Sequence, residues 1–193
     1  MARKKNFVEV DILEKALGLF WERGYNATSV QDLVDDLGIN RASIYDTWGD
    51  KHGLYLETLK HYRQQTSSYL LEKLRSERSA KDILKDFLFD VVNDSVQDEM
   101  RKGCFMANSA TEMANSDSVV YKMFTDNRLK MEAVLNELIK EGQESGEFAS
   151  KFESEAYARF IFNTATGLRT LAKGTISEKE LNDVVDVALS ALV

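Results

Sequence analysis

Side chains that can form hydrogen bonds with nucleic acid are concentrated between residues 40 and 51. Arg41 can donate two parallel bonds to the edge of a guanine, and the hydroxyl groups of Ser43, Tyr45 and Thr47 suit phosphate oxygens and base edges. These four side chains fall on the outer face of a predicted short helix, where little apolar surface needs burial. Their chemistry is that of DNA recognition.

Two short helices separated by a glycine turn must hold this face in place. Gly38 is the residue type that ends a helix in the left-handed conformation, and Asn40 can cap the helix that follows. Thr28 and Gln31 have the spacing of a capping box at the start of the first short helix. The pattern is typical of a helix-turn-helix. The apolar residues that would pack its helices together are Val30, Leu33, Val34, Leu37, Ile39 and Ile44.

A helical hairpin inside a bundle, with polar residues that bind nothing, is the alternative interpretation. The flanking sequence argues against it, because a long amphipathic helix ends near Gly24 and Asp50 can cap another long helix that begins at Lys51. The run FWERGYNATSVQDLVDDLGINRASIYDTWGDKHGLYLETL resembles the N-terminal DNA-binding domain of the TetR family of transcriptional regulators. This resemblance covers roughly the first quarter of the chain.

The resemblance implies a role for each matching residue. Arg41, Ala42, Ser43 and Tyr45 match the positions that read bases in the major groove, and Arg41 is the best single candidate for a contact to guanine. The positions that grip phosphates match Thr28, Ser29, Tyr45, Thr47 and Lys51, although Tyr45 could instead support helix packing. The expected DNA-binding residues are therefore Thr28, Ser29, Asn40, Arg41, Ala42, Ser43, Tyr45, Thr47 and Lys51.

The charge of this region departs from that of a general DNA-binding surface. Acidic residues outnumber basic ones up to Lys51, so positive charge must be arranged locally. Asp46 lies inside the expected recognition helix, and we expect it to point away from the phosphates, the alternative being a contact to a cytosine amino group. The short basic arm of Arg3, Lys4 and Lys5 fits either a DNA contact or a contribution to solubility.

Composition predicts an all-α protein of long helices. The 193 residues include no proline, and 44% of them are hydrophobic, enough for a sizeable core. No apolar run approaches the roughly 20 residues of a membrane span, and the N-terminal stretch lacks the apolar core of a signal peptide. With Cys104 as the single cysteine no internal disulfide can form, so we expect a cytoplasmic protein with no membrane partner.

We expect about nine helices in two domains. Residues 1–52 would form a three-helix helix-turn-helix domain, and residues 53–193 a helical ligand-binding and dimerisation domain, a role implied mainly by the resemblance. The longer helices are predicted at about 51–75, 80–96, 118–144, 154–173 and 177–192. The last two carry apolar stripes with small residues, which favours a four-helix interface between the two subunits of a homodimer.

Bulky, adaptable side chains and polar residues within apolar helices are candidates for a ligand pocket in the second domain. An ordinary core position is the alternative for each of them. For the histidine, a structural role is the favoured interpretation, and for the cysteine, an inert core position is favoured over an oxidation or electrophile sensor. The candidate residues are His61, Phe87, Cys104, Phe105, Asn108, Phe124, Phe160 and Asn163.

These features predict a ligand-responsive transcriptional regulator. A homodimer would bind an inverted-repeat operator on double-stranded DNA and, as a repressor, would be released by a small-molecule effector whose identity the sequence does not specify. The alternatives are a helical small-molecule carrier or sensor without DNA activity and an activator of the same fold. The chain has no P-loop, dinucleotide-binding glycine motif, nucleophile elbow or HExxH motif, so we expect no enzymatic activity, cofactor or metal site.

Overall fold

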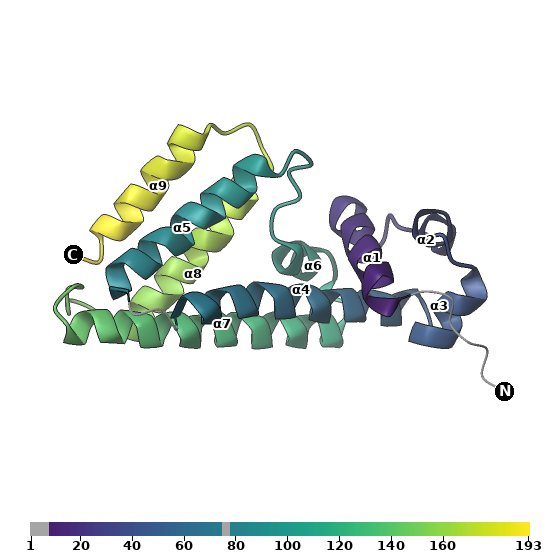
Figure 1. Cartoon of the computed structure of the whole chain (residues 1–193), viewed down its shortest axis with the longest axis horizontal. Coiled ribbons are helices and arrows are strands. Elements are labelled where there is room, and N and C mark those ends of the chain that lie inside the picture. Colours follow the sequence, from purple (N-terminus) through teal and green to yellow (C-terminus); the bar gives the residue numbers. More distant parts are fainter. Residues whose placement is uncertain (1–7, 75–77) are drawn as a thin grey trace. The chain divides into compact units, whose positions relative to one another are not determined.

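The computed structural model describes residues 8–74 and 78–193, which contain nine α-helices and no β-strand (Figure 1). The predicted all-α fold is therefore confirmed, and the predicted limits of the longer helices hold to within about two residues. The basic arm of Arg3, Lys4 and Lys5 lies outside the described residues. The helices are α1 (Glu9–Arg23), α2 (Val30–Leu37), α3 (Arg41–Trp48), α4 (Lys51–Leu74), α5 (Ala80–Gln97), α6 (Phe105–Met113), α7 (Ser118–Glu144), α8 (Ser154–Leu171) and α9 (Glu178–Ser190).

These helices form two compact units. The first comprises the described residues up to Gln65 together with Phe105–Met123, and the second comprises the described residues of Thr66–Cys104 and Phe124–Val193. This division differs from the boundary predicted between residues 52 and 53. The first part of α4, all of α6 and the start of α7 pack with the helix-turn-helix, so that α4 and α7 each contribute to both units.

An aromatic cluster explains why α4 and α6 belong to the first unit. The ring of Tyr55 on α4 lies edge-on to Phe20 of α1, with 5.0 Å between centroids, and 5.8 Å from Phe105 of α6. Trp21 of α1 lies 5.0 Å from Tyr62 and 6.0 Å from Phe105. Aromatic pairs of this kind each add about 0.5–1.5 kcal/mol beyond the burial of their area.

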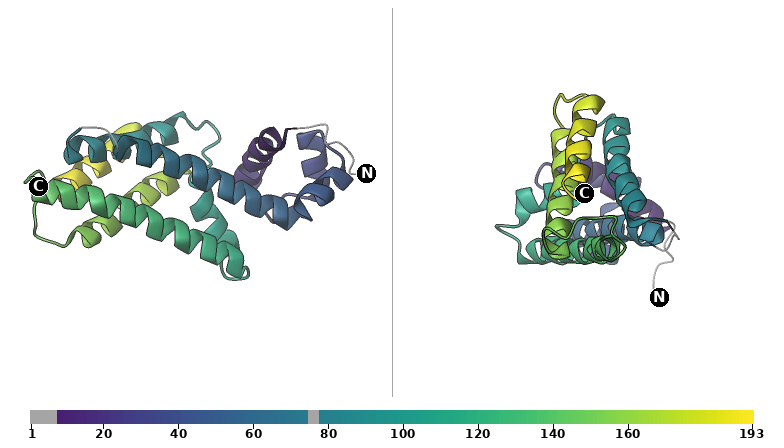
Figure 2. Two further views of the ribbon diagram at one scale, coloured as in Figure 1. Left: turned by 60° about the horizontal axis from the view of Figure 1, so that its bottom comes forward. Right: turned by 90° about the vertical axis from the view of Figure 1, so that its left-hand side faces the viewer.

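The second unit is built around α5, α8 and α9, which pack on one another (Figure 2). The last turns of α7 pack closely on the loop that follows them. A Cβ atom at Gly142 would lie only 2.2 Å from the ring of Phe148. Glycine therefore permits this close approach. The most deeply buried side chains of this core include Leu84, Leu88, Val92, Leu135, Ile139, Ile161 and Val185.

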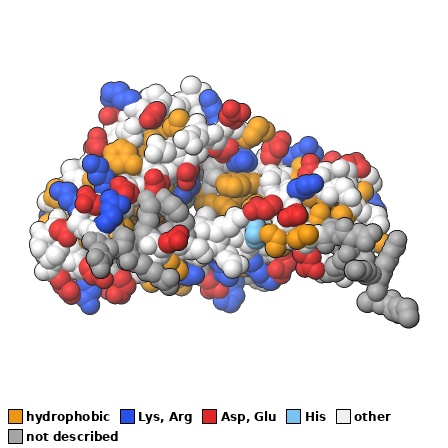
Figure 3. All heavy atoms as spheres, viewed as in Figure 1, with side chains coloured by type: hydrophobic (Ala, Val, Ile, Leu, Met, Phe, Trp, Pro, Cys, Tyr) orange, Lys and Arg blue, Asp and Glu red, His pale blue; other side chains and the backbone are white. Residues whose placement is uncertain are grey.

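None of the described helices is long and apolar enough to cross a membrane. The face of the protein drawn in Figure 3 carries acidic and basic side chains in alternation rather than one broad field of either sign.

Candidate nucleic-acid interface

The turn between α2 and α3 has the conformation that the sequence predicts. Gly38 adopts φ 66° and ψ 25°, the left-handed region, and its N–H donates to the carbonyl of Val34 at 3.2 Å. The side chain of Asn40 accepts from the N–H of Ser43 at 2.9 Å and so caps α3. Ile44, at the centre of α3, is completely buried, so α3 is fixed both at its start and at its centre.

The start of α2 differs from the prediction by one residue. Ser29, not Thr28, is the N-cap: its hydroxyl oxygen accepts from the N–H of Asp32 at 3.1 Å, and the Asp32 carboxylate accepts from the N–H of Ser29 at 2.8 Å. The predicted Thr28–Gln31 capping box is therefore wrong. These bonds with Ser29 hold the pKa of Asp32 below its usual value. Gln31 instead donates to Asp35 at 2.8 Å.

Thr28 is also unsuited to the phosphate contact expected of it. Its side chain is completely buried, and its hydroxyl donates to the carbonyl of Gly24 at 2.7 Å. A hydroxyl that closes the turn after α1 cannot reach solvent or DNA. Ser29, which is exposed, keeps its place beside the N-terminus of α2.

Lys51 is occupied by the same turn. Its ammonium donates to the carbonyls of Tyr25 at 2.9 Å and Thr28 at 2.8 Å, and it lies 4.1 Å from the centre of the Tyr25 ring. Burial lowers the pKa of Lys51, and the carboxylate of Glu112 opposes this effect. Lys51 thus stabilises the turn before α2, and any phosphate contact would have to use its remaining N–H.

The outer side of α3 forms a mostly polar face. Arg41, Ala42, Tyr45 and Asp46 are exposed, whereas Ser43 and Thr47 are half-buried. Tyr45 leaves 43% of its surface accessible, so its ring is free to contact a partner instead of serving as a core residue. We call the six residues Arg41, Ala42, Ser43, Tyr45, Asp46 and Thr47 the α3 face.

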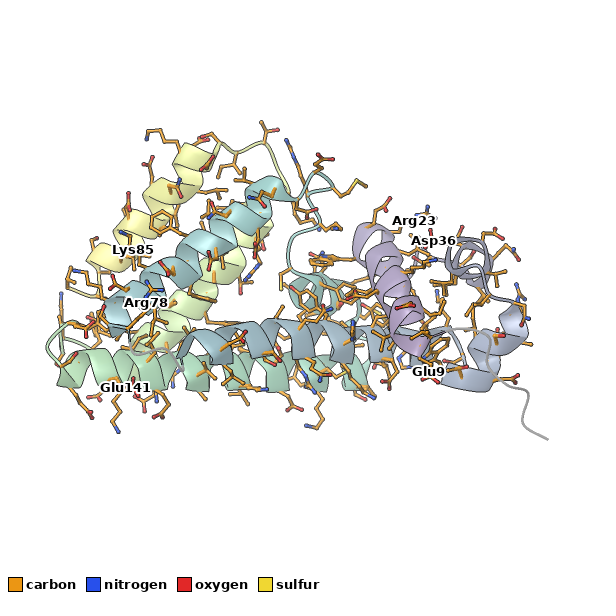
Figure 4. All side chains as sticks on the ribbon, in the orientation of Figure 1. Glu9, Arg23, Asp36, Arg78, Lys85 and Glu141 are labelled. Carbon is orange, nitrogen blue, oxygen red and sulfur yellow. The ribbon has the colours of Figure 1, made fainter. Side chains whose placement is uncertain are left out.

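Electrostatic attraction around the α3 face is modest. Asp46 is one of its exposed residues, Asp50 is exposed just after α3, and Asp35 and Asp36 are exposed on α2. Arg23 at the end of α1 (Figure 4) lies 3.6 Å from Asp32, which offsets its charge. Binding to DNA through this face must rely on a few well-placed contacts rather than on surplus positive charge.

Sequence reasoning missed the residues that tie α6 to this region. The carboxylate of Glu112 accepts from the N–H groups of Tyr25 at 3.0 Å and Asn26 at 2.7 Å. The Nε2 atom of His52 lies 2.5 Å from the carboxylate of Asp117, just before α7. These partners are far apart in the sequence, so no local spacing could indicate them.

The eight candidate ligand residues are divided between the two units. His61, Phe105 and Asn108 belong to the first unit, whereas Phe87, Cys104, Phe124, Phe160 and Asn163 belong to the second. Phe105 lies in the aromatic cluster, and Phe87 lies in the core of the second unit. His61 lies 3.2 Å from the carboxylate of Glu14, an arrangement that needs no ligand. Cys104, Asn108 and Phe124 are half-buried.

Phe160 and Asn163 are both exposed on α8, outside the core of the second unit, and their role in ligand binding stays a prediction. The apolar stripe predicted on α8 splits between two sides of the helix: Ile161 and Leu168 face the core, while Phe160 and Leu171 remain exposed. On α9, Val184 and Val187 are exposed as well. We call the exposed apolar residues Phe160, Leu171, Val184 and Val187 the α8–α9 patch.

Comparison with known proteins matches both halves of the chain. The sequence model described as bacterial regulatory proteins, tetR family, matches residues 12–58, and the one described as tetracyclin repressor-like, C-terminal domain, matches residues 80–188. The HTH-type transcriptional regulator YezE of Bacillus subtilis (strain 168), described as uncharacterized, is 33% identical over 100% of both chains. The HTH-type transcriptional repressor ComR of Escherichia coli (strain K12) is 25% identical over 97% of this chain and 90% of its own length.

Solved structures agree with this match. The TetR family transcriptional regulator CifR, as a cysteine mutant complexed with 26bp double-strand operator DNA, superposes with a TM-score of 0.87 at 28% identity. The alignment covers 98% of this chain and 99% of that one. The similarity therefore extends over both units and includes the α3 face.

Proposed function

The chain belongs to the tetR family of bacterial regulatory proteins and is an HTH-type transcriptional regulator, and on that premise we propose that it is a repressor that binds an inverted-repeat operator as a homodimer and leaves it on binding a small molecule. The single observation that supports the DNA-binding part is the α3 face, an exposed surface on a capped helix that Ile44 anchors in the core. Its relative ComR is described as a repressor, and CifR was solved with operator DNA.

The α8–α9 patch supports the dimer. Phe160, Leu171, Val184 and Val187 expose 42%, 52%, 38% and 68% of their surfaces in the single chain. Large apolar side chains gathered on neighbouring helices mark protein interfaces, and two copies of α8 and α9 make a four-helix contact with two-fold symmetry. A two-fold dimer presents two α3 faces about 34–36 Å apart, or somewhat more, which requires an inverted repeat.

Release by an effector requires that the second unit act on the helix-turn-helix. α4 and α7 run through both units, so a change in the packing of the second unit is carried covalently into the first. A coupling free energy of about 1–3 kcal/mol between effector and operator would weaken binding by about 5- to 150-fold. We propose a cytoplasmic location, because the operator is chromosomal DNA and because Cys104, as the single cysteine of the chain, cannot form an internal disulfide.

Selection of DNA from a random-sequence pool tests the proposal without knowledge of the regulated genes. Purified protein should enrich an inverted repeat, bound by one dimer and resistant to excess nonspecific DNA at near-physiological salt. Enrichment of no sequence, with binding lost on addition of competitor, would overturn the proposal and favour a helical small-molecule carrier.

A further inference from the structure

The turn between α1 and α2 holds a carboxylate from another part of the chain. The N–H groups of Tyr25 and Asn26 both donate to Glu112 of α6, at 3.0 and 2.7 Å. They follow Gly24, whose φ of 85° is in the left-handed region, and a Cβ at Gly24 would lie 2.9 Å from a Glu112 oxygen. Successive N–H groups after such a residue form a concave anion site, and here the anion is Glu112.

Two further contacts hold α6 and the residues that follow it to α4. The hydroxyl of Tyr55, on α4, donates to Ser109 of α6 at 2.7 Å, and both side chains are buried. Asp117 lies beside His52 and also accepts from the N–H groups of Val119 and Val120 at the start of α7. All three contacts lie inside the first unit, so α6 forms part of the surroundings of the helix-turn-helix.

The turn held by Glu112 leads directly into the DNA-binding elements. Its carbonyl groups at Tyr25 and Thr28 are bound by Lys51, and its N–H groups are bound by Glu112. Ser29, the next residue, is the N-cap of α2. A movement of α6 that withdraws the Glu112 carboxylate leaves two N–H groups without their acceptor and loosens the turn on which α2 is mounted.

We propose that Glu112 is the positioning residue through which α6 sets the start of α2 for operator binding. The inference rests on the proposed function and adds a route to it: an effector that displaces α6 removes one carboxylate from the α1–α2 turn. The helix-turn-helix region keeps the buried side chains of Leu33, Ile44 and Leu54, so it stays folded while its alignment on DNA is lost.

The variant Glu112→Ala tests this role, with Glu22→Ala as the matched control, because Glu22 is exposed on α1 and its loss changes the net charge equally. Amide hydrogen exchange followed by NMR should be at least about tenfold faster at Tyr25 and Asn26 in Glu112→Ala and unchanged in Glu22→Ala. Operator affinity should fall by about 5- to 50-fold relative to Glu22→Ala, with helical content retained in the circular dichroism spectrum.

Glu112→Gln separates positioning from a general loss of stability. Its amide oxygen can still accept one of the two bonds, so both exchange and affinity should lie between those of the parent and those of Glu112→Ala. Unchanged exchange at Tyr25 and Asn26, or faster exchange with an affinity equal to that of Glu22→Ala, would overturn the proposal. Hydrogen exchange needs no DNA, so it tests whether Glu112 binds the α1–α2 turn even if no operator is found. Failure to find an operator would count against the proposed function alone.

Discussion

The ammonium nitrogen of Lys51 lies 2.8 Å from the carbonyl oxygen of Thr28, the residue that closes the turn after α1. It also donates to Tyr25 and lies over the ring of that residue. Lys51 is the first residue of α4. The helix that continues into the second unit is therefore anchored by its first side chain to the turn that precedes α2.

Replacing Lys51 by methionine should lower the free energy of unfolding by about 1–3 kcal/mol, since two carbonyl groups lose a charged donor. Urea denaturation followed by circular dichroism measures this change. Lys60→Met is the control on the same helix: Lys60 is exposed and pairs with Glu57 on the surface, so its loss should change stability by no more than about 0.5 kcal/mol. Equal effects of the two substitutions would show that Lys51 does not anchor the turn.

Local patterns were sufficient for the longer helices and for the turn between α2 and α3. Gly38 and Asn40 act through residues at most four positions away, so their roles can be predicted without tertiary structure. The capping box was misplaced because Thr28 and Ser29 both have a suitable hydroxyl, and only the burial of Thr28 decides between them. Local sequence does not report that burial.

Contacts over long sequence separations could not be predicted. Asn26 and Glu112 are 86 residues apart, and the bond between them depends on where α6 packs. The orientation of α8 is a similar case: an apolar stripe on that helix is wide enough to serve the core and an interface together, and only the packing of α5 and α9 separates Ile161 from Phe160.

Stability in acid should depend on Asp117. Burial raises the pKa of its carboxyl, but hydrogen bonds from the Val120 N–H, from His52 and from the Val119 N–H outweigh burial and place the pKa below its usual 3.8. A carboxyl whose pKa is lowered by folding stabilises the protein above its unfolded pKa, and this contribution is lost as the pH falls through the folded pKa. Asp117→Asn should therefore be less stable than the parent at neutral pH.

The difference between the parent and Asp117→Asn should shrink as the pH falls below about 4, as followed by chemical denaturation at a series of pH values. Asp36→Asn is the control, because Asp36 is exposed on α2. Its effect on stability should be small. A difference for Asp117→Asn that stays constant down to the acid limit would contradict the account of this carboxyl.

Asp46 on the α3 face should oppose binding to DNA of any sequence. Its carboxylate is exposed, and phosphates repel it. Asp46→Asn should tighten binding to operator and to unrelated DNA by a similar factor, about two- to fivefold at near-physiological salt, in titrations of labelled duplexes. Loss of preference at a single base pair would instead show that Asp46 accepts a bond from a cytosine amino group.

A charge within the α8–α9 patch should separate the dimer. Phe160→Glu places a carboxylate where a second copy would cover it, so the dimer should weaken at least about tenfold in sedimentation velocity, and operator binding should weaken with it. Val96→Glu is the control: Val96 is 47% exposed, but it lies on α5, outside the patch. A Phe160→Glu protein that remains as dimeric as Val96→Glu would place the interface elsewhere.

The central claim, that the α3 face reads an operator, is tested most directly by a fluorescence-anisotropy titration of Arg41→Ala against the selected inverted repeat. Arg41 is exposed, so its loss should leave the fold intact while weakening operator binding by about 1–3 kcal/mol per contact to guanine, or roughly 5- to 150-fold for each half-site. Lys140→Ala removes the same charge from an exposed position on α7 and should bind as the parent does. If Arg41→Ala bound the operator as tightly as Lys140→Ala, α3 would not be the helix that reads DNA.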